Sequence, residues 1–403
     1  MRGAVVIAAL GLVGVGLLLV AQRFLDDLQA PAGPAPAPLL AVDEEPALPL
    51  AAKEPGQPGQ PAPAPAGEAA SAPSPRELAL QENRRALEAL QRGELEQAVR
   101  LLEGCCERDP EEAVFRRNLA VARASWAEEL VDSPEPADRA RALELLERAL
   151  TDLDGEERAA MEARLERWRA QAQHEDGFFT SGNPRFELAY DGDHAELRAA
   201  ETDLLERLDR AYQDLGELFG AFPLEGRRLR VVLYRAEDFT RLTGLGHWAG
   251  GVFDGTIRVP IGAEGVDPRL DSVLRHELTH AFIERVGGGG CPAWLNEGLA
   301  QVLEQRTFDR QRAQTAAAAL RGGPRLGPAD LDRPFVGLGD EDRIRAAYRW
   351  SLAFVDHLRW TWGEDLPFEM ARAGTQSTTA AAVFHQHLGL DLATEWERFA
   401  AGL

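Results

Sequence analysis

Two histidines with a glutamate between them are the residues in this sequence that are best placed to do chemistry. His276, Glu277 and His280 occur together in the segment HELTH. Side chains four residues apart lie on one face of a helix, so both imidazoles can reach the same metal ion. Glu277 projects beside such an ion instead of binding it, and its carboxylate can then accept a proton from a water molecule. This spacing predicts a metal-assisted hydrolysis.

The residues around this motif predict a helix over 268–286 that would position it. Asp267 is a favourable N-cap residue, and Pro268 suits the first helical position because its missing N–H needs no partner there. Apolar side chains recur at helical spacing and predict the buried face of this helix: Leu270, Val273, Leu274, Leu278 and Phe282. Four glycines then favour a chain reversal, and Pro292 can open a second helix over 293–306 that carries the segment WLNEGLA.

The segments HELTH and WLNEGLA together resemble the gluzincin zinc metallopeptidases. The resemblance implies that His276, His280 and Glu297 bind one zinc ion and that Glu277 is the catalytic general base. Such a ligand set leaves a fourth position for water, as catalytic zinc sites require. The GxMEN-type sequence with which aminopeptidases anchor a free amine is absent, and this favours endopeptidase action. The layout over residues 178–403 is also similar to the bacterial peptidase MA-like domains.

Hydrolysis of an amide also needs a hydrogen-bond donor opposite the metal, and tyrosine or histidine often provides it. Tyr348 lies in the region where related domains have this donor, and we expect it to be catalytic; a packing role is the alternative. His357 is the second candidate for the same role. Gln301, one helical turn after Glu297, could orient a metal ligand or could be a solvated polar residue of its helix.

Residues 174–403 are predicted to form an α+β domain, with a small mixed sheet first and a helical, zincin-like half carrying the HExxH helix after it. Alternating patterns indicate three short strands around a long amphipathic helix over 195–219: 186–190, 229–234 and 256–261. The last strand could form the edge along which an extended peptide pairs. Further helices are expected over 342–361, 377–386 and 391–401.

The preceding segment, residues 76–173, has a helical pattern throughout. Small residues recur in it at spacings that resemble the tetratricopeptide repeat: Ala86, Ala98, Cys105, Ala120, Ala142 and Ala149. In that repeat, small side chains let paired helices approach closely. The resemblance implies an all-α array that is either a platform for a protein partner or a spacer.

The N-terminal segments are expected to anchor and space the protein. Residues 4–21 carry no charge and are nearly long enough to span a bilayer, so residues 1–25 are predicted to be an uncleaved signal-anchor, a single transmembrane helix. Residues 26–75 are rich in proline and alanine and are predicted to be an extended linker. The catalytic domain would then lie outside the cytoplasm, in the periplasm if the cell is Gram-negative.

Composition excludes several other classes of protein. The chain of 403 residues has a net charge of -22 and no block of lysine or arginine, so nucleic acid is not an expected partner. Lys53, in a Pro/Ala-rich tract, is the only lysine, which excludes an intact P-loop and a Schiff-base enzyme. The three cysteines form no CxxC metal or redox motif.

These features predict a membrane-anchored, extracytoplasmic zinc metallopeptidase. It would hydrolyse the peptide bonds of a protein or peptide substrate, with water activated by zinc and with Glu277 as the general base. The alternative is a catalytically silent envelope scaffold, in which the repeats and the peptidase-like domain only bind proteins. A third possibility is hydrolysis of a non-peptide amide, such as a cell-wall link, by the same ligand set.

Overall fold

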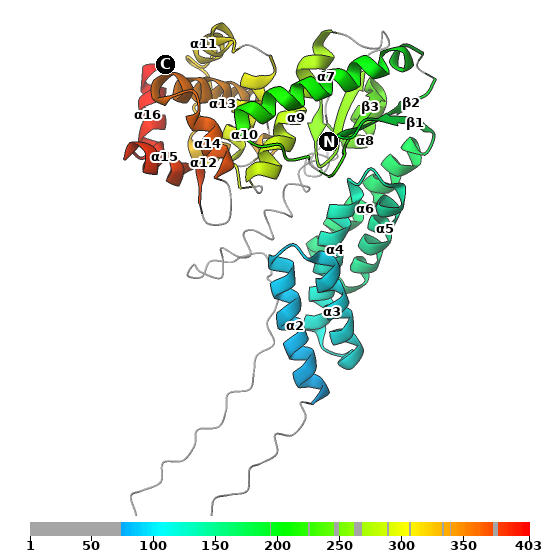
Figure 1. Ribbon diagram of the computed structural model, residues 1–403. Coiled ribbons are helices and arrows are strands. Elements are labelled where there is room, and N and C mark those ends of the chain that lie inside the picture. The colour runs from blue at the N-terminus through cyan, green and yellow to red at the C-terminus, as the bar shows by residue number, and fades with distance from the viewer. Residues whose placement is uncertain are drawn as a thin grey trace, which may run out of the picture. The chain divides into compact units, whose positions relative to one another are not determined.

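The computed structural model describes most of the chain from residue 74 onward (Figure 1). The described ranges are 74–193, 195–224, 226–245, 250–261, 268–287, 290–305, 308–332, 334–338, 340–373 and 378–403. Within these ranges the chain groups into two compact units, residues 128–144 with 159–403 and residues 74–127 with 145–158. The domain boundary expected at residue 174 stays a prediction.

Residues 75–175 form helices joined by short connections, as predicted. Its elements are α2 (Pro75–Gln91), α3 (Leu95–Arg108), α4 (Ala113–Val131), α5 (Pro136–Ala149), the short 3-10 helix η2 (Leu150–Asp152) and α6 (Gly155–Glu175). The six small residues singled out in the sequence are all fully buried, at 0% exposure. Cys105 of α3 donates its thiol hydrogen to the carbonyl of Ala79 in α2, at 3.2 Å. All six small side chains are therefore buried within the described helices, and the tetratricopeptide-like arrangement stays a prediction.

A five-stranded mixed sheet follows, in the order β1-β2-β3-β5-β4. The strands are β1 (Phe178–Gly182), β2 (Phe186–Asp191), β3 (Leu229–Arg235), β4 (Val252–Phe253) and β5 (Ile257–Ile261). The three inner strands are parallel, and the two outer strands pair antiparallel to them. The expected small mixed sheet is thus present. The expectation that 256–261 forms the edge is wrong, because β4 pairs along the outer side of β5.

Alternating side chains of the sheet face two different hydrophobic clusters. Val231 and Leu233 of β3 belong to the large core that also includes α7 (Ala195–Phe219), the crossover between two parallel strands. Val232 and Tyr234 pack instead with Phe239 from the short helix α8 (Ala236–Thr243). Both faces of the sheet are covered, so its inner strands are mostly apolar, and each also buries one charged side chain: Glu187, Arg230 and Arg258.

The C-terminal half is helical, in agreement with the predicted α+β class (Figure 1). Its elements are α9 (Pro268–Gly287), α10 (Ala293–Leu303), α11 (Arg310–Ala319), α12 (Pro328–Leu331), η3 (Phe335–Leu338), α13 (Glu341–Trp362), α14 (Leu366–Arg372), α15 (Ala380–Leu388) and α16 (Leu392–Gly402). Helix α10 packs against both α9 and α13, and α9 packs against α7 and β5. This packing fixes the position of the HELTH helix.

Two residues set the distances between these helices. Gly298 of α10 has no space for a side chain, since an added Cβ would lie 2.4 Å from Val355 Cγ2 and 2.6 Å from the carbonyl oxygen of Ser351, both on α13. The buried Arg275 of α9 donates from Nε to the carbonyl of Leu303, at 2.6 Å, and contacts Asp214 of α7 at 2.9 Å. Helix α10 is therefore packed tightly against α13, and α9 is tied by Arg275 to α10 and to α7.

The predicted membrane anchor requires a correction. None of the helices in the described part of the chain combines the length and the apolar character needed to cross a bilayer. This finding contradicts the predicted signal-anchor and transmembrane helix and the single-pass membrane location derived from it. The segments on which that prediction and the linker prediction rest, residues 1–25 and 26–75, lie outside the described residues except at their C-terminal end.

Replacing Gly298 by alanine is expected to lower the free energy of unfolding by about 1–3 kcal/mol, because the added methyl group overpacks the contact between α10 and α13. Urea denaturation followed by circular dichroism measures this change. Gly402→Ala is the control, since nothing lies near that helical glycine. Equal stabilities of the two variants would contradict the close approach of the helices.

Candidate metal centre

Three side chains from two helices converge on one point. His276 and His280 of α9 and Glu297 of α10 each contribute a ligand atom, and these atoms all lie within 4.8 Å of one another. The two imidazole rings are one helical turn apart, with centroids 4.8 Å apart and planes nearly perpendicular. The structure therefore brings together the three residues predicted to bind metal.

Both histidines are oriented by a hydrogen bond at the ring nitrogen that faces away from this point. His276 Nδ1 lies 3.0 Å from Glu304 Oε1, and His280 Nδ1 lies 2.8 Å from Asn296 Oδ1. Such partners hold a metal-binding imidazole in the required tautomer and orientation. Sequence reasoning missed both residues. The available signal was their position, because Asn296 adjoins Glu297, and Glu304 follows it by two helical turns on the same face.

One atom, Oε2 of Glu297, indicates that the site can hold a cation. Oε2 of Glu297 is buried and accepts no hydrogen bond within the described structure. It lies 3.6 Å from His276 Nε2 and 3.8 Å from His280 Nε2, which is too long for hydrogen bonds. These separations are close to those between ligand atoms that surround an ion held about 2 Å from each of them. Two imidazoles and one carboxylate are a donor set typical of catalytic zinc sites.

The electrostatics of the centre also favour a positive charge. Burial lowers the pKa of His276, but the carboxylates of Glu297 and Glu304 on its two sides raise it by more, to about 10. For Glu297, burial raises the pKa, and the nearby His280 and His276 lower it by more, so that its carboxylate stays charged. A metal ion at this point would balance the negative charge of Glu297, as the proton on His276 does.

Glu277 lies beside the three donors without joining them. Its side chain is 5% exposed, and burial raises its pKa to about 8, with the charge of Glu297 adding to the effect and His276 opposing it. A Cβ added to Gly251 would lie 2.8 Å from Glu277 Oε1, so the chain just before the edge strand β4 passes over this carboxylate without a side chain between them. A carboxylate with a pKa near neutrality is suited to proton transfer.

Tyr348 of α13 lies close to the same carboxylates. The negative charge of Glu297, then burial, then Glu277 raise the pKa of Tyr348 well above its usual value, so its hydroxyl stays protonated. Its ring packs perpendicular to that of Phe335, with centroids 5.1 Å apart. Tyr348 thus has both the packing contact and the proximity to the centre that the sequence left open as alternatives.

The other two candidates from the sequence have different contacts. Gln301 donates from Nε2 to the backbone carbonyls of Tyr348, at 2.9 Å, and Glu297, at 3.2 Å, so it ties α13 to α10 and touches no metal-site donor side chain. His357 Nε2 lies 2.8 Å from Glu395 Oε1 of α16 and takes no part in the centre. Within the described ranges, His276, His280 and Glu297 form the one group suited to holding a metal ion.

Comparison with known proteins adds no family to this description. No protein-family model matches the chain, and no curated protein matches it with significance. The geometry and chemistry of the centre therefore carry the conclusion about function.

Replacing Glu304 or Asn296 by alanine is expected to weaken zinc binding about 10- to 100-fold, because the imidazole behind each loses the acceptor that orients it. Competition with a chromophoric chelator measures the affinity. The control is Gln305→Ala, an exposed neighbour of Glu304. Unchanged affinity in both alanine variants would contradict the orienting role.

Proposed function

We propose that this chain is a zinc-dependent peptidase of the gluzincin type that hydrolyses internal bonds of a peptide substrate. The observation that carries the proposal is the buried, hydrogen-bond-free oxygen of Glu297, which points between the Nε2 atoms of His276 and His280. The motifs HELTH and WLNEGLA, which contain these three residues, resemble the ligand motifs of that class. Glu277 adjoins them with a pKa suited to a general base.

Each residue has a distinct role in the proposed reaction. Zinc, when bound, would supply a Lewis acid that polarises the substrate carbonyl and makes water more acidic. The Glu277 carboxylate takes the proton from the attacking water and delivers it to the departing amine. Tyr348, which stays protonated, donates a hydrogen bond to the carbonyl oxygen as negative charge develops on it.

The edge of the sheet is the proposed binding surface for the substrate backbone. Strand β4 is the last strand in the sheet, and the chain at Gly251 passes directly over Glu277. An extended peptide that pairs along β4 would therefore bring one of its amide groups toward that carboxylate. Binding through backbone hydrogen bonds needs no free terminus, which supports endopeptidase action.

The helices α2 to α6 are proposed to form a tetratricopeptide-like array that binds a protein partner. The fully buried small residues support this type of packing, because they let neighbouring helices approach closely. Such arrays present an extended concave surface on which protein segments bind.

Purified full-length protein is expected to contain about one zinc ion per chain, because two imidazoles and one carboxylate converge on one point. Inductively coupled plasma mass spectrometry measures the metal content. His280→Ala should lose the zinc. His385→Ala, a histidine of α15 that is not one of the three candidate ligands, should retain it. A folded wild-type protein without zinc would contradict the proposal and favour a silent scaffold.

The Glu277→Gln variant is expected to bind zinc normally and to lose about 10²- to 10⁴-fold in peptide hydrolysis, because glutamine cannot accept the proton. Cleavage of an internally quenched peptide library measures the rate. Glu284→Gln, two turns further along α9, is the matched control and should retain activity. Undiminished hydrolysis by Glu277→Gln would remove this residue as the base.

A further inference from the structure

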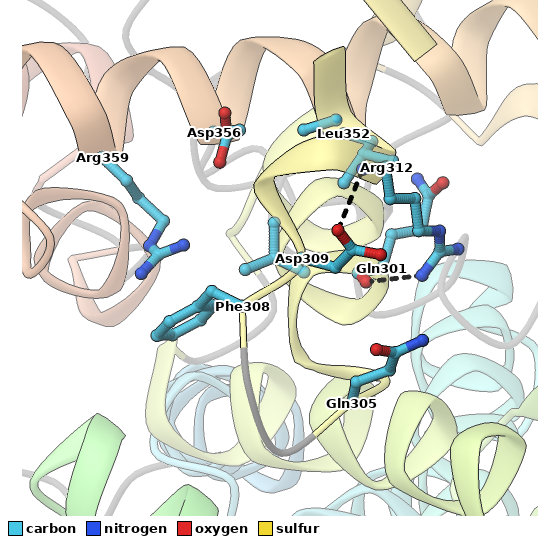
Figure 2. A pocket seen from close by; sticks show the side chains of 10 residues that line it. Gln301, Gln305, Phe308, Asp309, Arg312, Leu352, Asp356 and Arg359 are labelled. Carbon is cyan, nitrogen blue, oxygen red and sulfur yellow. Dashed lines mark hydrogen bonds between the residues drawn. The ribbon is translucent and has the colours of Figure 1, made fainter. Parts of the chain in front are cut away.

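The pocket between α10, α11 and α13 has no room for an organic ligand (Figure 2). It encloses about 10 Å³, which is enough for about one water molecule. Charged side chains of its wall bind within the protein: Asp309 Oδ1 accepts the backbone N–H of Arg312, and Arg312 Nη1 donates to the carbonyl of Gln301, both at 3.1 Å. A contact that bears on the proposed reaction lies instead at the turn between β4 and β5.

This turn is short and determines where the edge strand lies. Phe253 of β4 pairs with Ile257 of β5, and the three residues 254–256 connect them. The backbone N–H of Asp254 donates to the carbonyl of Thr256 at 3.3 Å, and Gly255 has a φ of +96°, which favours glycine. Because β4 has two residues and is the last strand of the sheet, few backbone hydrogen bonds hold it, and its position depends on the turn.

Asp132 lies directly against this turn. It follows the last residue of α4 in the segment 128–144, which belongs to the same compact unit as the sheet. Its Oδ1 accepts the hydroxyl hydrogen of Thr256 at 3.0 Å, and Thr256 is 1% exposed, so the hydrogen bond is shielded from water. A Cβ added to Gly255 would overlap the Asp132 carboxyl group. Asp132 therefore contacts the turn as closely as a glycine allows.

The contact does not depend on the charge of Asp132. Burial, with the charge of Asp254 adding to it, raises the pKa of Asp132 to about 8, and Arg258 and the hydrogen bond from Thr256 oppose this shift. A carboxyl group keeps an acceptor oxygen whether or not it is protonated. Asp132 can thus hold the Thr256 hydroxyl in both forms.

The other end of β4 lies at the metal centre. A Cβ added to Gly251, the residue before β4, would lie 2.8 Å from Glu277 Oε1 and 3.0 Å from Val273 Cγ1. In the proposed reaction an extended peptide pairs along β4. A displacement of the turn would therefore move the bound peptide relative to Glu277.

We propose that Asp132 is a positioning residue for substrate binding, which holds Gly255 and Thr256 and thereby places β4 for pairing with the peptide. This inference rests on the proposed peptidase function, because it assigns β4 a role in that reaction. Asp132 is not one of the metal-site donors, so its effect is on the binding of the peptide and not on the binding of zinc.

Steady-state hydrolysis of an internally quenched peptide by the full-length protein tests the proposal. Asp132→Ala removes the acceptor for Thr256 but leaves Glu277 and the zinc ligands in place, so KM is expected to rise about tenfold and kcat to change less than about twofold. Asp132→Asn keeps an acceptor oxygen and should have a KM within about threefold of the wild type. The control is Glu144→Ala, an exposed acidic residue of the same segment.

Variants of Thr256 test the same contact from its other side and replace Asp132→Ala if that variant does not fold. Thr256→Val exchanges the hydroxyl for a methyl group of similar size and should also raise KM about tenfold, whereas Thr256→Ser keeps the donor and should raise it less. Hydrogen exchange at the amides of Val252 and Phe253 gives a readout that does not need activity. It should be faster in Asp132→Ala and Thr256→Val.

The positioning role and the peptidase activity can fail separately. An active wild type with an unchanged KM in both Asp132→Ala and Thr256→Val would overturn the role of Asp132 and leave the peptidase proposal standing. A loss of kcat at unchanged KM would do the same, because it would move the effect from binding to the chemical step. A zinc-loaded wild type that hydrolyses no peptide would overturn both proposals.

Discussion

The Glu297 carboxylate, one oxygen of which is buried, is the constraint on which the arrangement of α9 and α10 depends. One of its oxygens is removed from water without a hydrogen bond, and burying an anion in this way costs several kcal/mol unless a cation compensates it. The compensation comes from the His276 imidazole of α9, whose pKa is raised to about 10 mainly by Glu297 and Glu304 against the effect of burial, so α9 and α10 must stay in register. Gly298 and Arg275 hold that register through backbone contacts on either side of α10.

The residues of the centre could be predicted because each lies in a strongly patterned helix. The spacing of His276 and His280 places both on one face wherever the helix packs, and the apolar stripe of α9 determines that this face points away from the core. The inner strands of the sheet were predictable for a similar reason, since both of their faces are buried and their residues are mostly apolar, β-branched or aromatic.

Other features depend on tertiary contacts and left no such signal. Strand β4 has two residues, too few to establish a period, and this is why β5 was mistaken for the edge. Glu304 resembles an ordinary surface glutamate until the packing of α10 brings it to His276.

The two histidines of the centre are unequal as electron donors, because the groups behind them differ in charge. His280 faces the neutral amide of Asn296, whereas His276 faces the carboxylate of Glu304. A carboxylate behind an imidazole gives it partial imidazolate character and strengthens its donation, which reduces the Lewis acidity of a bound metal ion. Arg312 shares the Glu304 carboxylate and withdraws part of its charge. Through Arg312 and Glu304, a residue in the first turn of α11 thus affects how strongly His276 of α9 donates electrons to a bound metal ion.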